Sequence, residues 1–284
     1  MTAINSLLAG LFDYAGLYPP ASLGLRSAAN NYVEYVRSVQ ASSLGRFIIN
    51  IDRLDEFRST VGEYLGQFRI SVVLTDPAGL DVLAKEIRRG MPIETVEMKC
   101  TRPEEIEEIA RRIPQQLAAY FEVPINAEGR VALSSIARVG ARAKIRMGGI
   151  SPEAIPQVPE VAQTLAVLAE LRLPFKATAG LHHPVRSSRA LTYKPQSPKG
   201  TMHGFMNLCC AAAVLYFGGK AGDAEKLLHE EDATTWQVST DAIQWRHLKW
   251  RTDQLAELRR DFVHSIGSCS FVEPMHDLES LGWL

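Results

Sequence analysis

Short β-like runs alternate with longer helical runs along most of the chain, and this alternation constrains the fold more than any other feature. Seven of the eight β-like runs are followed by a helical pattern, so consecutive strands need crossover helices and form a parallel sheet. Eight such units in 284 residues predict an α/β fold, a (β/α)8 or TIM barrel. An open, doubly wound sheet uses the same units and is the alternative. The predicted strands lie at residues 11–14, 46–51, 69–75, 95–99, 118–123, 143–147, 174–178 and 262–266.

No repeat and no change of composition marks a domain boundary, so residues 1–284 are expected to form a single domain. Residues 181–262 contain no clear strand. They hold a loop rich in Ser, Pro, Gly and Lys at 187–200, an apolar helix at 202–217 and a Trp-rich helix at 241–261. We expect this stretch to be a long helical insertion between the seventh and eighth strands that covers the C-terminal face of the barrel.

Composition excludes several classes of protein. The 31 Lys and Arg residues balance 32 Asp and Glu residues, which argues against a nucleic-acid partner. The longest apolar run, residues 205–219, is shorter than the roughly 20 residues that cross a bilayer, and no signal peptide is evident, so we expect a cytoplasmic protein with no membrane partner. The four cysteines form no CxxC pair, which argues against a structural zinc site. No Gly-rich nucleotide-binding motif follows an early strand, so no cofactor is expected.

Charged residues occur in the later strands, although strands of a parallel sheet are buried on both faces and should be nearly all apolar. Residues two apart in a strand share a face, and the alternate positions here are apolar, so one parity directs the charges into the barrel. Buried charges cost several kcal/mol each unless they are paired. Because barrel active sites lie at the C-terminal ends of the strands, the set predicts an active site. A purely structural ionic network is the alternative. The predicted set comprises Asp13, Glu97, Lys99, Glu122, Lys144, Arg146, Lys176 and Thr178.

Further cations and glycines follow these strands. The slight positive excess at the barrel mouth favours a small anionic substrate, a phosphate ester or a carboxylate. Glycines after the later strands can present backbone N–H groups to a phosphate. His203 and Asn207 are one helical turn apart and are expected to cap the mouth together. The expected substrate-binding residues beyond the strands are His182, His183, Arg186, His203, Asn207, Gly148, Gly149, Gly180, Gly267 and Ser268.

The paired lysines suggest the chemistry. A lysine among other cations in a partly dry pocket has a lowered pKa, and its neutral amine attacks a carbonyl to give a Schiff base. Lys176 is the first candidate for the nucleophile and Lys144 the second. Glu122 and Glu97 are placed to move protons, and Lys99 to bind charge.

The run Lys176-Ala177-Thr178-Ala179-Gly180, with Lys144 on the preceding strand, resembles the paired strand lysines of the class I aldolase barrels, deoxyribose-phosphate aldolase in particular. In that family one lysine forms the Schiff base and a lysine on the next strand perturbs it. The family's reactive lysine lies on the sixth strand in a K-x-x-x-G context, which occurs here at both Lys144 and Lys176. The resemblance covers the sixth and seventh strands and implies an aldolase-like lyase. Residues 12–20, 144–149 and 176–186 also resemble a bacterial barrel family without an assigned activity.

Other functions remain open at this point. A cofactor-free isomerase or lyase would use Glu97 or Glu122 as base and the lysines to stabilise an enolate. A non-catalytic barrel would keep the anion pocket alone. A metal hydrolase ranks last, because the histidines follow no known zinc spacing and no metal is expected.

Two further features are better explained by packing than by catalysis. Cys269, near the end of the last strand, ranks low among the candidate nucleophiles. Trp236, Trp245 and Trp250 predict helix packing or the interface of a homo-oligomer.

Overall fold

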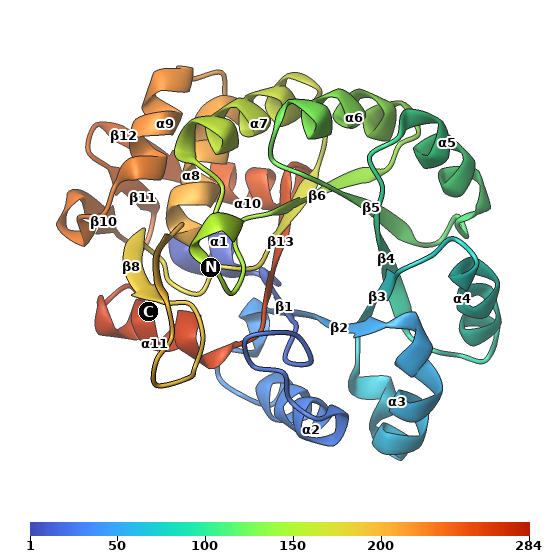
Figure 1. Ribbon diagram of the computed structural model, residues 1–284. Helices are drawn as coiled ribbons and strands as arrows, with labels where there is room; N and C mark the ends of the chain where they lie inside the picture. Colours follow the sequence, from blue (N-terminus) through green and yellow to red (C-terminus); the bar gives the residue numbers. More distant parts are fainter.

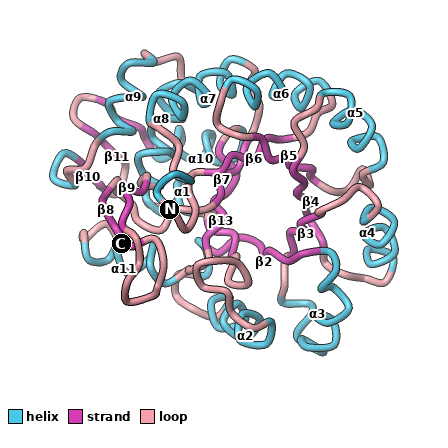
Figure 2. Tube along the Cα trace, in the orientation of Figure 1, coloured by secondary structure: helices cyan, strands magenta, loops and turns pink.

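Eight parallel strands close into a barrel, and helices form a ring around it (Figure 1, Figure 2). The computed structural model describes residues 1–284. The order of strands around the barrel is β1-β13-β7-β6-β5-β4-β3-β2, so the predicted (β/α)8 fold is confirmed and the open sheet is wrong. The barrel strands are β1 (Phe12–Tyr14), β2 (Leu44–Asn50), β3 (Ile70–Leu74), β4 (Ile93–Lys99), β5 (Ala118–Val123), β6 (Arg142–Arg146), β7 (Phe175–Thr178) and β13 (Val263–Ser268).

The helices follow from local signals as well as from packing. Helix α5 begins at Pro103, has acidic residues in its first turn and ends on Arg111 and Arg112, which suits the helix dipole. The α-helices are α1 (Ala3–Leu8), α2 (Leu25–Val36), α3 (Leu54–Val61), α4 (Gly79–Arg88), α5 (Pro103–Arg112), α6 (Ala127–Arg138), α7 (Val158–Glu170), α8 (Phe205–Tyr216), α9 (Ala221–His229), α10 (Thr252–Asp261) and α11 (Val272–Ser280). The short 3₁₀ helices are η1 (Ala41–Ser43), η2 (Ile51–Arg53), η3 (Gly62–Gln67), η4 (Pro152–Ala154) and η5 (Ala233–Thr235).

The register of the later strands sets charged residues side by side. Glu122 pairs with Lys99 on one side and with Lys144 on the other, and Lys144 pairs in turn with Lys176. Lys176 is paired with Ser265 of β13. Because paired residues of neighbouring strands face the same side of a sheet, the side chains of Glu122, Lys144 and Lys176 face the barrel interior.

The segment between β7 and β13 holds more strand than the sequence predicted. A hairpin of β8 (Ser187–Ala190) and β9 (Lys199–Met202) precedes α8, and the apolar helix therefore begins at Phe205 rather than at residue 202. After α9, the strands β10 (Trp236–Val238), β11 (Ala242–Trp245) and β12 (Leu248–Arg251) form a separate antiparallel sheet.

The predicted helix at 241–261 is thus wrong over its first half. The indoles of Trp236 and Trp245 belong to register partners on β10 and β11, and Trp250 pairs with Ile243 across β11 and β12. All four side chains are buried. Aromatic and β-branched residues favour such a pleated, half-buried surface over a helix. The tryptophans therefore pack a small sheet, not a helix.

The apolar core lies between the barrel and its helices, and one aromatic group illustrates it. The ring of Phe47 on β2 packs 5.3 Å from the ring of Phe57 on α3 and 5.6 Å from the ring of Tyr32 on α2, measured between centroids. None of the helices combines the length and the apolar character that a membrane-crossing segment needs.

Candidate active site

A cavity of about 370 Å³ opens at the C-terminal ends of the barrel strands. This volume lies within the range of small-molecule sites. Its floor and walls include Ile48, Val73, Glu97, Glu122, Lys144 and Thr178, from six different strands. Tyr18, Pro19 and Pro20 from the loop after β1 and Leu191 and Met202 from the β8–β9 hairpin line its mouth. Of the region 181–262, only the part up to Met202 reaches the cavity.

Lys144 presents its amine to this cavity between two carboxylates. Its Nζ lies 2.8 Å from Glu97 Oε2 and 2.8 Å from Glu122 Oε2. The Lys144 side chain keeps 8% of its surface exposed. At the rim, Arg146 Nε donates to Glu122 Oε1 at 3.0 Å, and the Arg146 side chain is half exposed. Burial raises the pKa of Glu122, but Lys144 and Arg146 outweigh it, so the pKa is lowered and the carboxylate is ionised at neutral pH.

Lys176 lies one layer deeper and is sealed. Its Nζ donates to Asp13 Oδ2 at 2.5 Å and to Glu97 Oε1 at 2.7 Å, and it lies 5.5 Å from the centre of the Tyr120 ring. The side chain is fully buried and does not line the cavity. Burial lowers the pKa of Lys176, but Asp13 and Glu97 outweigh it and raise the pKa above its usual value.

This geometry reverses the order of the two lysines. The sequence analysis named Lys176 first and Lys144 second, and expected each lysine to lower the pKa of the other. In the structure Glu97 lies between Lys176 and Lys144, and each ammonium also has a carboxylate of its own. The carboxylates stabilise the charged form of Lys176 and leave it no path to a ligand.

Small polar residues complete the buried network, and the sequence reading missed them. Thr95 donates to Ser71 Oγ at 2.6 Å, and Ser71 donates to Glu97 Oε1 at 2.5 Å. Ser265 donates to Asp13 Oδ2 at 2.7 Å. Burial raises the pKa of Asp13 and of Glu97, but the neighbouring cations outweigh it and lower both pKa values. Hydroxyl residues at inward strand positions are the sequence signal for them, and this signal does not identify their partners.

Several predicted residues line the cavity, and others, including the buried Asp13, do not. Thr178, Gly149, Gly180 and Gly267 all line it. Lys99 is exposed and does not line it, so its place inside the barrel is corrected. Because Lys99 is the last residue of β4, its side chain extends past the closed part of the barrel into solvent.

Gly148 and Ser268 have structural roles behind the wall. A Cβ atom added to Gly148 would lie 2.9 Å from Gly180 Cα, so the loops after β6 and β7 touch through their backbones. The Ser268 hydroxyl donates to the Ser270 carbonyl at 2.7 Å. Neither residue lines the cavity, which corrects their expected role in binding substrate.

His203 and Asn207 do not cap the barrel mouth. His203 Nε2 lies 2.8 Å from the Pro156 carbonyl, and burial lowers its pKa to about 4. The Asn207 amide donates to the Leu227 and Glu230 carbonyls at 2.7 and 2.9 Å. Both side chains are fully buried and hold loops together, because the start of α8 faces α9 rather than the cavity.

The adjacent histidines diverge. His182 lines the cavity, whereas His183 Nδ1 lies 2.6 Å from Asp277 Oδ2 on α11. Arg186 Nε donates to Glu231 Oε1 at 3.2 Å and is also outside the cavity. Both histidine rings contact carboxylates of α11, since His182 Nδ1 lies 3.0 Å from Glu273 Oε2, but only His182 also lines the cavity. The expected anion contacts from His183 and Arg186 are therefore corrected.

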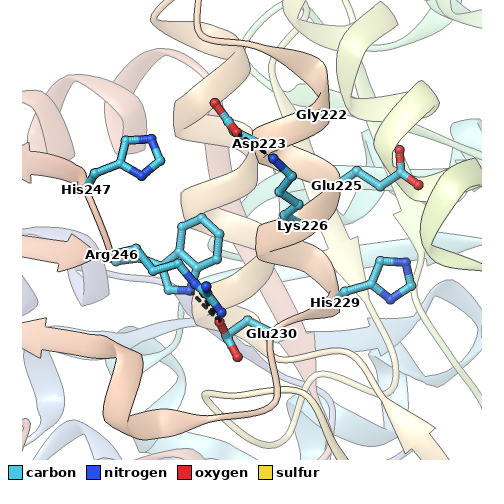
Figure 3. Close-up of a pocket in the computed structure, with 9 residues that line it drawn as sticks. Gly222, Asp223, Glu225, Lys226, His229, Glu230, Arg246 and His247 are labelled. Atoms are coloured by element: carbon cyan, nitrogen blue, oxygen red, sulfur yellow. Dashed lines mark hydrogen bonds and ion pairs between the residues drawn. The ribbon is translucent and has the colours of Figure 1, made fainter.

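A larger hollow of about 680 Å³ lies away from the barrel axis, between α9 and the β11–β12 turn (Figure 3). Its wall is mostly charged, but Glu230 accepts from Arg246 at 2.6 Å and from the Trp245 indole at 3.1 Å. Lys226 lies 3.5 Å from Asp223. These groups satisfy one another near solvent, so the buried charge that marks a site is in the barrel. No three His, Cys, Asp or Glu side chains in the protein are grouped so that they could hold a metal ion.

Comparisons with known proteins add little to this picture. No protein-family model and no curated protein matches the sequence. The solved structure of FabK from Thermotoga maritima is similar with a TM-score of 0.38 and 15% identity. The match covers 65% of this chain and 56% of that one. A likeness this weak supports no conclusion about the fold or the function of this protein.

Proposed function

We propose that this protein is an aldolase-like lyase that acts on a small anionic carbonyl compound through a Schiff base on Lys144. One observation carries the proposal: of the two buried lysines, Lys144 alone opens into the cavity at the C-terminal face, and it does so between two carboxylates. A paired lysine on the next strand, Lys176, matches the arrangement of the aldolase barrels that the sequence resembles.

The carboxylates divide the proton transfers that such chemistry needs. Lys144 must lose a proton before it attacks, and Glu122 Oε2 lies 2.8 Å from its Nζ. The amine nitrogen then bonds to the carbonyl carbon, the oxygen takes the proton, and loss of water leaves an iminium ion. Glu97 is held by Lys176 and keeps its negative charge, which stabilises the iminium.

The iminium then weakens the neighbouring carbon–carbon bond. As that bond breaks, its electron pair moves toward the nitrogen to give an enamine, and a carboxylate takes the proton of the departing hydroxyl. Protonation of the enamine and addition of water return the free lysine. Glu122 is the shuttle for these protons because it reaches both Lys144 and the open rim.

The rim suits an anionic group on the substrate. Arg146 donates to Glu122 through Nε and its side chain is half exposed, so its remaining N–H groups are available to a carboxylate or phosphate. Gly149 and Gly180 bring backbone to the same wall without side chains in the way. A phosphate ester or a keto acid fits this charge.

Borohydride trapping tests the proposal. The protein is incubated separately with pyruvate, glyoxylate and glyceraldehyde 3-phosphate and reduced, and its mass and peptides are measured. We expect a gain equal to the carbonyl compound less one oxygen atom, on the peptide that contains Lys144. Lys144→Met should remove this adduct and the exposed control Lys226→Met should keep it. Adducts on surface lysines alone, or none with any compound, would overturn the proposal.

A second candidate rests on the same ion pairs. If Lys144 stays protonated between Glu97 and Glu122, its charge stabilises an enolate while Glu122 removes a proton, as in a cofactor-free isomerase or lyase. This candidate predicts no trapped adduct. It predicts exchange of a substrate α-proton with heavy water, which Glu122→Gln would abolish. Thermal stabilisation by phosphate with neither result would indicate an anion-binding barrel without catalysis.

A further inference from the structure

A cysteine, a histidine and a carboxylate line up at the edge of the cavity. Cys269 Sγ lies 4.0 Å from His182 Nε2, and the other ring nitrogen, Nδ1, lies 3.0 Å from Glu273 Oε2. Tyr193 donates its hydroxyl to the same Glu273 oxygen at 2.9 Å. The imidazole therefore connects a thiol to an oriented carboxylate.

Two distant parts of the chain supply this group. Cys269 follows β13 directly, His182 lies in the loop after β7, and Glu273 is in the first turn of α11. Cys269 and His182 both line the cavity, although each residue keeps only 6% of its surface exposed. The thiol thus faces the space that a ligand would occupy, in a shielded setting.

We propose that Cys269, His182 and Glu273 form a second nucleophilic site in this cavity, which takes the acyl group of an ester or thioester onto Cys269 Sγ. A nucleophile, a base within reach and a third group that orients the base are the parts that acyl transfer requires. The contact between sulfur and nitrogen is long, as such contacts often are before a ligand binds. This site is independent of any Schiff base on Lys144.

His182 is charged in its surroundings. Burial lowers the pKa of His182, but Cys269 and Glu273 outweigh it and raise the pKa to about 9. At neutral pH the ring is therefore an imidazolium beside the sulfur, with a proton to give to a leaving group. The other titratable groups that face this pair are Tyr193 from the hairpin, His183 with its ring centre 6.4 Å away, and Tyr14 from β1.

The other cysteines lack such a partner. Burial raises the pKa of Cys100, of Cys209 (to about 12) and of Cys210. Cys100 has Glu105 Oε2 3.6 Å from its sulfur, and this negative charge disfavours a thiolate. The protein therefore contains its own unreactive reference thiols.

The proposed step balances without a redox partner. The Cys269 thiolate bonds to the acyl carbon, and the bond from that carbon to its alkoxide or thiolate leaving group breaks. His182 Nε2 gives its proton to the leaving group. Water then attacks the thioester, His182 takes a proton from that water, and the acid and the free thiolate are released. Glu273 touches no reacting atom and is a positioning residue.

Alkylation tests whether the thiol is activated. Native protein is treated with iodoacetamide from pH 5 to 10, and the rate at each cysteine is read from its peptide. We expect Cys269 to react at neutral pH at least roughly tenfold faster than Cys100, with a lower pH midpoint. His182→Gln should move the Cys269 midpoint to higher pH, with folding checked by circular dichroism. Equal rates and midpoints for Cys269 and Cys100 in the native protein would overturn the proposal.

An acyl donor tests the chemistry itself. With p-nitrophenyl acetate we expect a burst of about one equivalent of p-nitrophenol and an acetyl group on the Cys269 peptide. Cys269→Ser should remove both, and Cys100→Ser should remove neither. Acetyl found on Lys144 or on surface lysines but never on Cys269 would contradict an acyl-accepting thiol, whatever borohydride shows about Lys144.

Discussion

Lys144 and Lys176 are register partners on adjacent strands and share one carboxylate, Glu97, yet they stand in different surroundings. Lys144 has Glu122 as its second partner and an open cavity beside it. Lys176 has Asp13 as its second partner and no exposed surface. The same residue type, one strand apart, is open to a ligand in one layer and sealed from it in the other.

The difference teaches that depth, rather than charge, separates the two roles. A sealed ion pair contributes fixed charge and shape, but no ligand reaches it. An ion pair with one open side keeps the same fixed charges and can also contact a ligand. Glu97 joins the layers, so Lys176 acts on the open site by holding the orientation and charge of Glu97.

The largest expected effect is on stability, from the sealed layer. Lys176→Met leaves the fully buried Asp13 with Arg46 3.9 Å away as its remaining cation and leaves Glu97 with Lys144 alone, so we expect a loss of roughly 3–5 kcal/mol in the free energy of unfolding. Lys144→Met should cost less, about 1–3 kcal/mol, because Glu122 keeps Arg146 and Glu97 keeps Lys176. Urea denaturation measures both. Equal losses would erase the distinction between the layers, and the exposed control Lys226→Met should change little.

A smaller effect should appear in the pH dependence of stability. Asp13 and Glu97 have pKa values lowered from 3.8 and 4.5, so their contribution is present above about pH 4.5 and is lost as the pH falls. The pKa of Lys176 is raised from 10.5, so its contribution is present below pH 10.5 and is lost as the pH rises beyond it. Urea midpoints from pH 3 to 11 should therefore fall at both ends.

Buried histidines also affect the stability of the fold, in a pH range next to that of the carboxylates, so their contribution must be separated from that of the network. Burial lowers the pKa of His203 and of His264 to about 4, so the stability that each neutral ring contributes to the fold is lost as the pH falls from 6.5 towards 4. Glu97→Gln should flatten the loss below pH 4.5 and leave the histidine part in place. An unchanged acid limb in Glu97→Gln would show that the network is not its source.

The smallest expected effect on stability is at the rim. Arg146→Gln removes a half-exposed ion pair, so we expect a change below about 1 kcal/mol. Trapping of an anionic carbonyl compound should nevertheless slow by up to about tenfold relative to a neutral one, since a charged contact is lost. The ratio of the two trapping rates is the measurement. Arg111→Gln, in the last turn of α5, is the matched control. An unchanged ratio in Arg146→Gln would show that Arg146 does not bind the anionic group.

The alternation of eight β-like runs with helical runs was enough to predict the barrel, because consecutive parallel strands need crossover helices. The inward placement of Glu97, Lys144 and Lys176 followed from the two-residue period within each strand. This period reports the face of a residue but not its depth, so it could not show that Lys176 is sealed and Lys144 is open. It also gave no reason to connect Ser71 or Ser265 with a charged network.

Loops and insertions were predicted less well, since no period of two or of 3.6 governs them. His182 and His183 are adjacent, and only the tertiary structure shows that His182 lines the cavity and His183 does not. The partner of His182, Glu273, lies 91 residues further along and carried no signal in the sequence. Trp245 was predicted to lie in a helix, because the apolar residues around it occur at mixed spacings that fit neither period clearly.

The bare backbones of Gly148 and Gly180 have a mechanical consequence. They press the loops after β6 and β7 together at a point where a single methyl group would not fit. Lys144 and Lys176 lie just before these loops. The distance between the two amines therefore depends on glycine, which has no side chain, at positions 148 and 180. An alanine at Gly148 would act as a wedge, which spreads the strand ends apart without altering any charge.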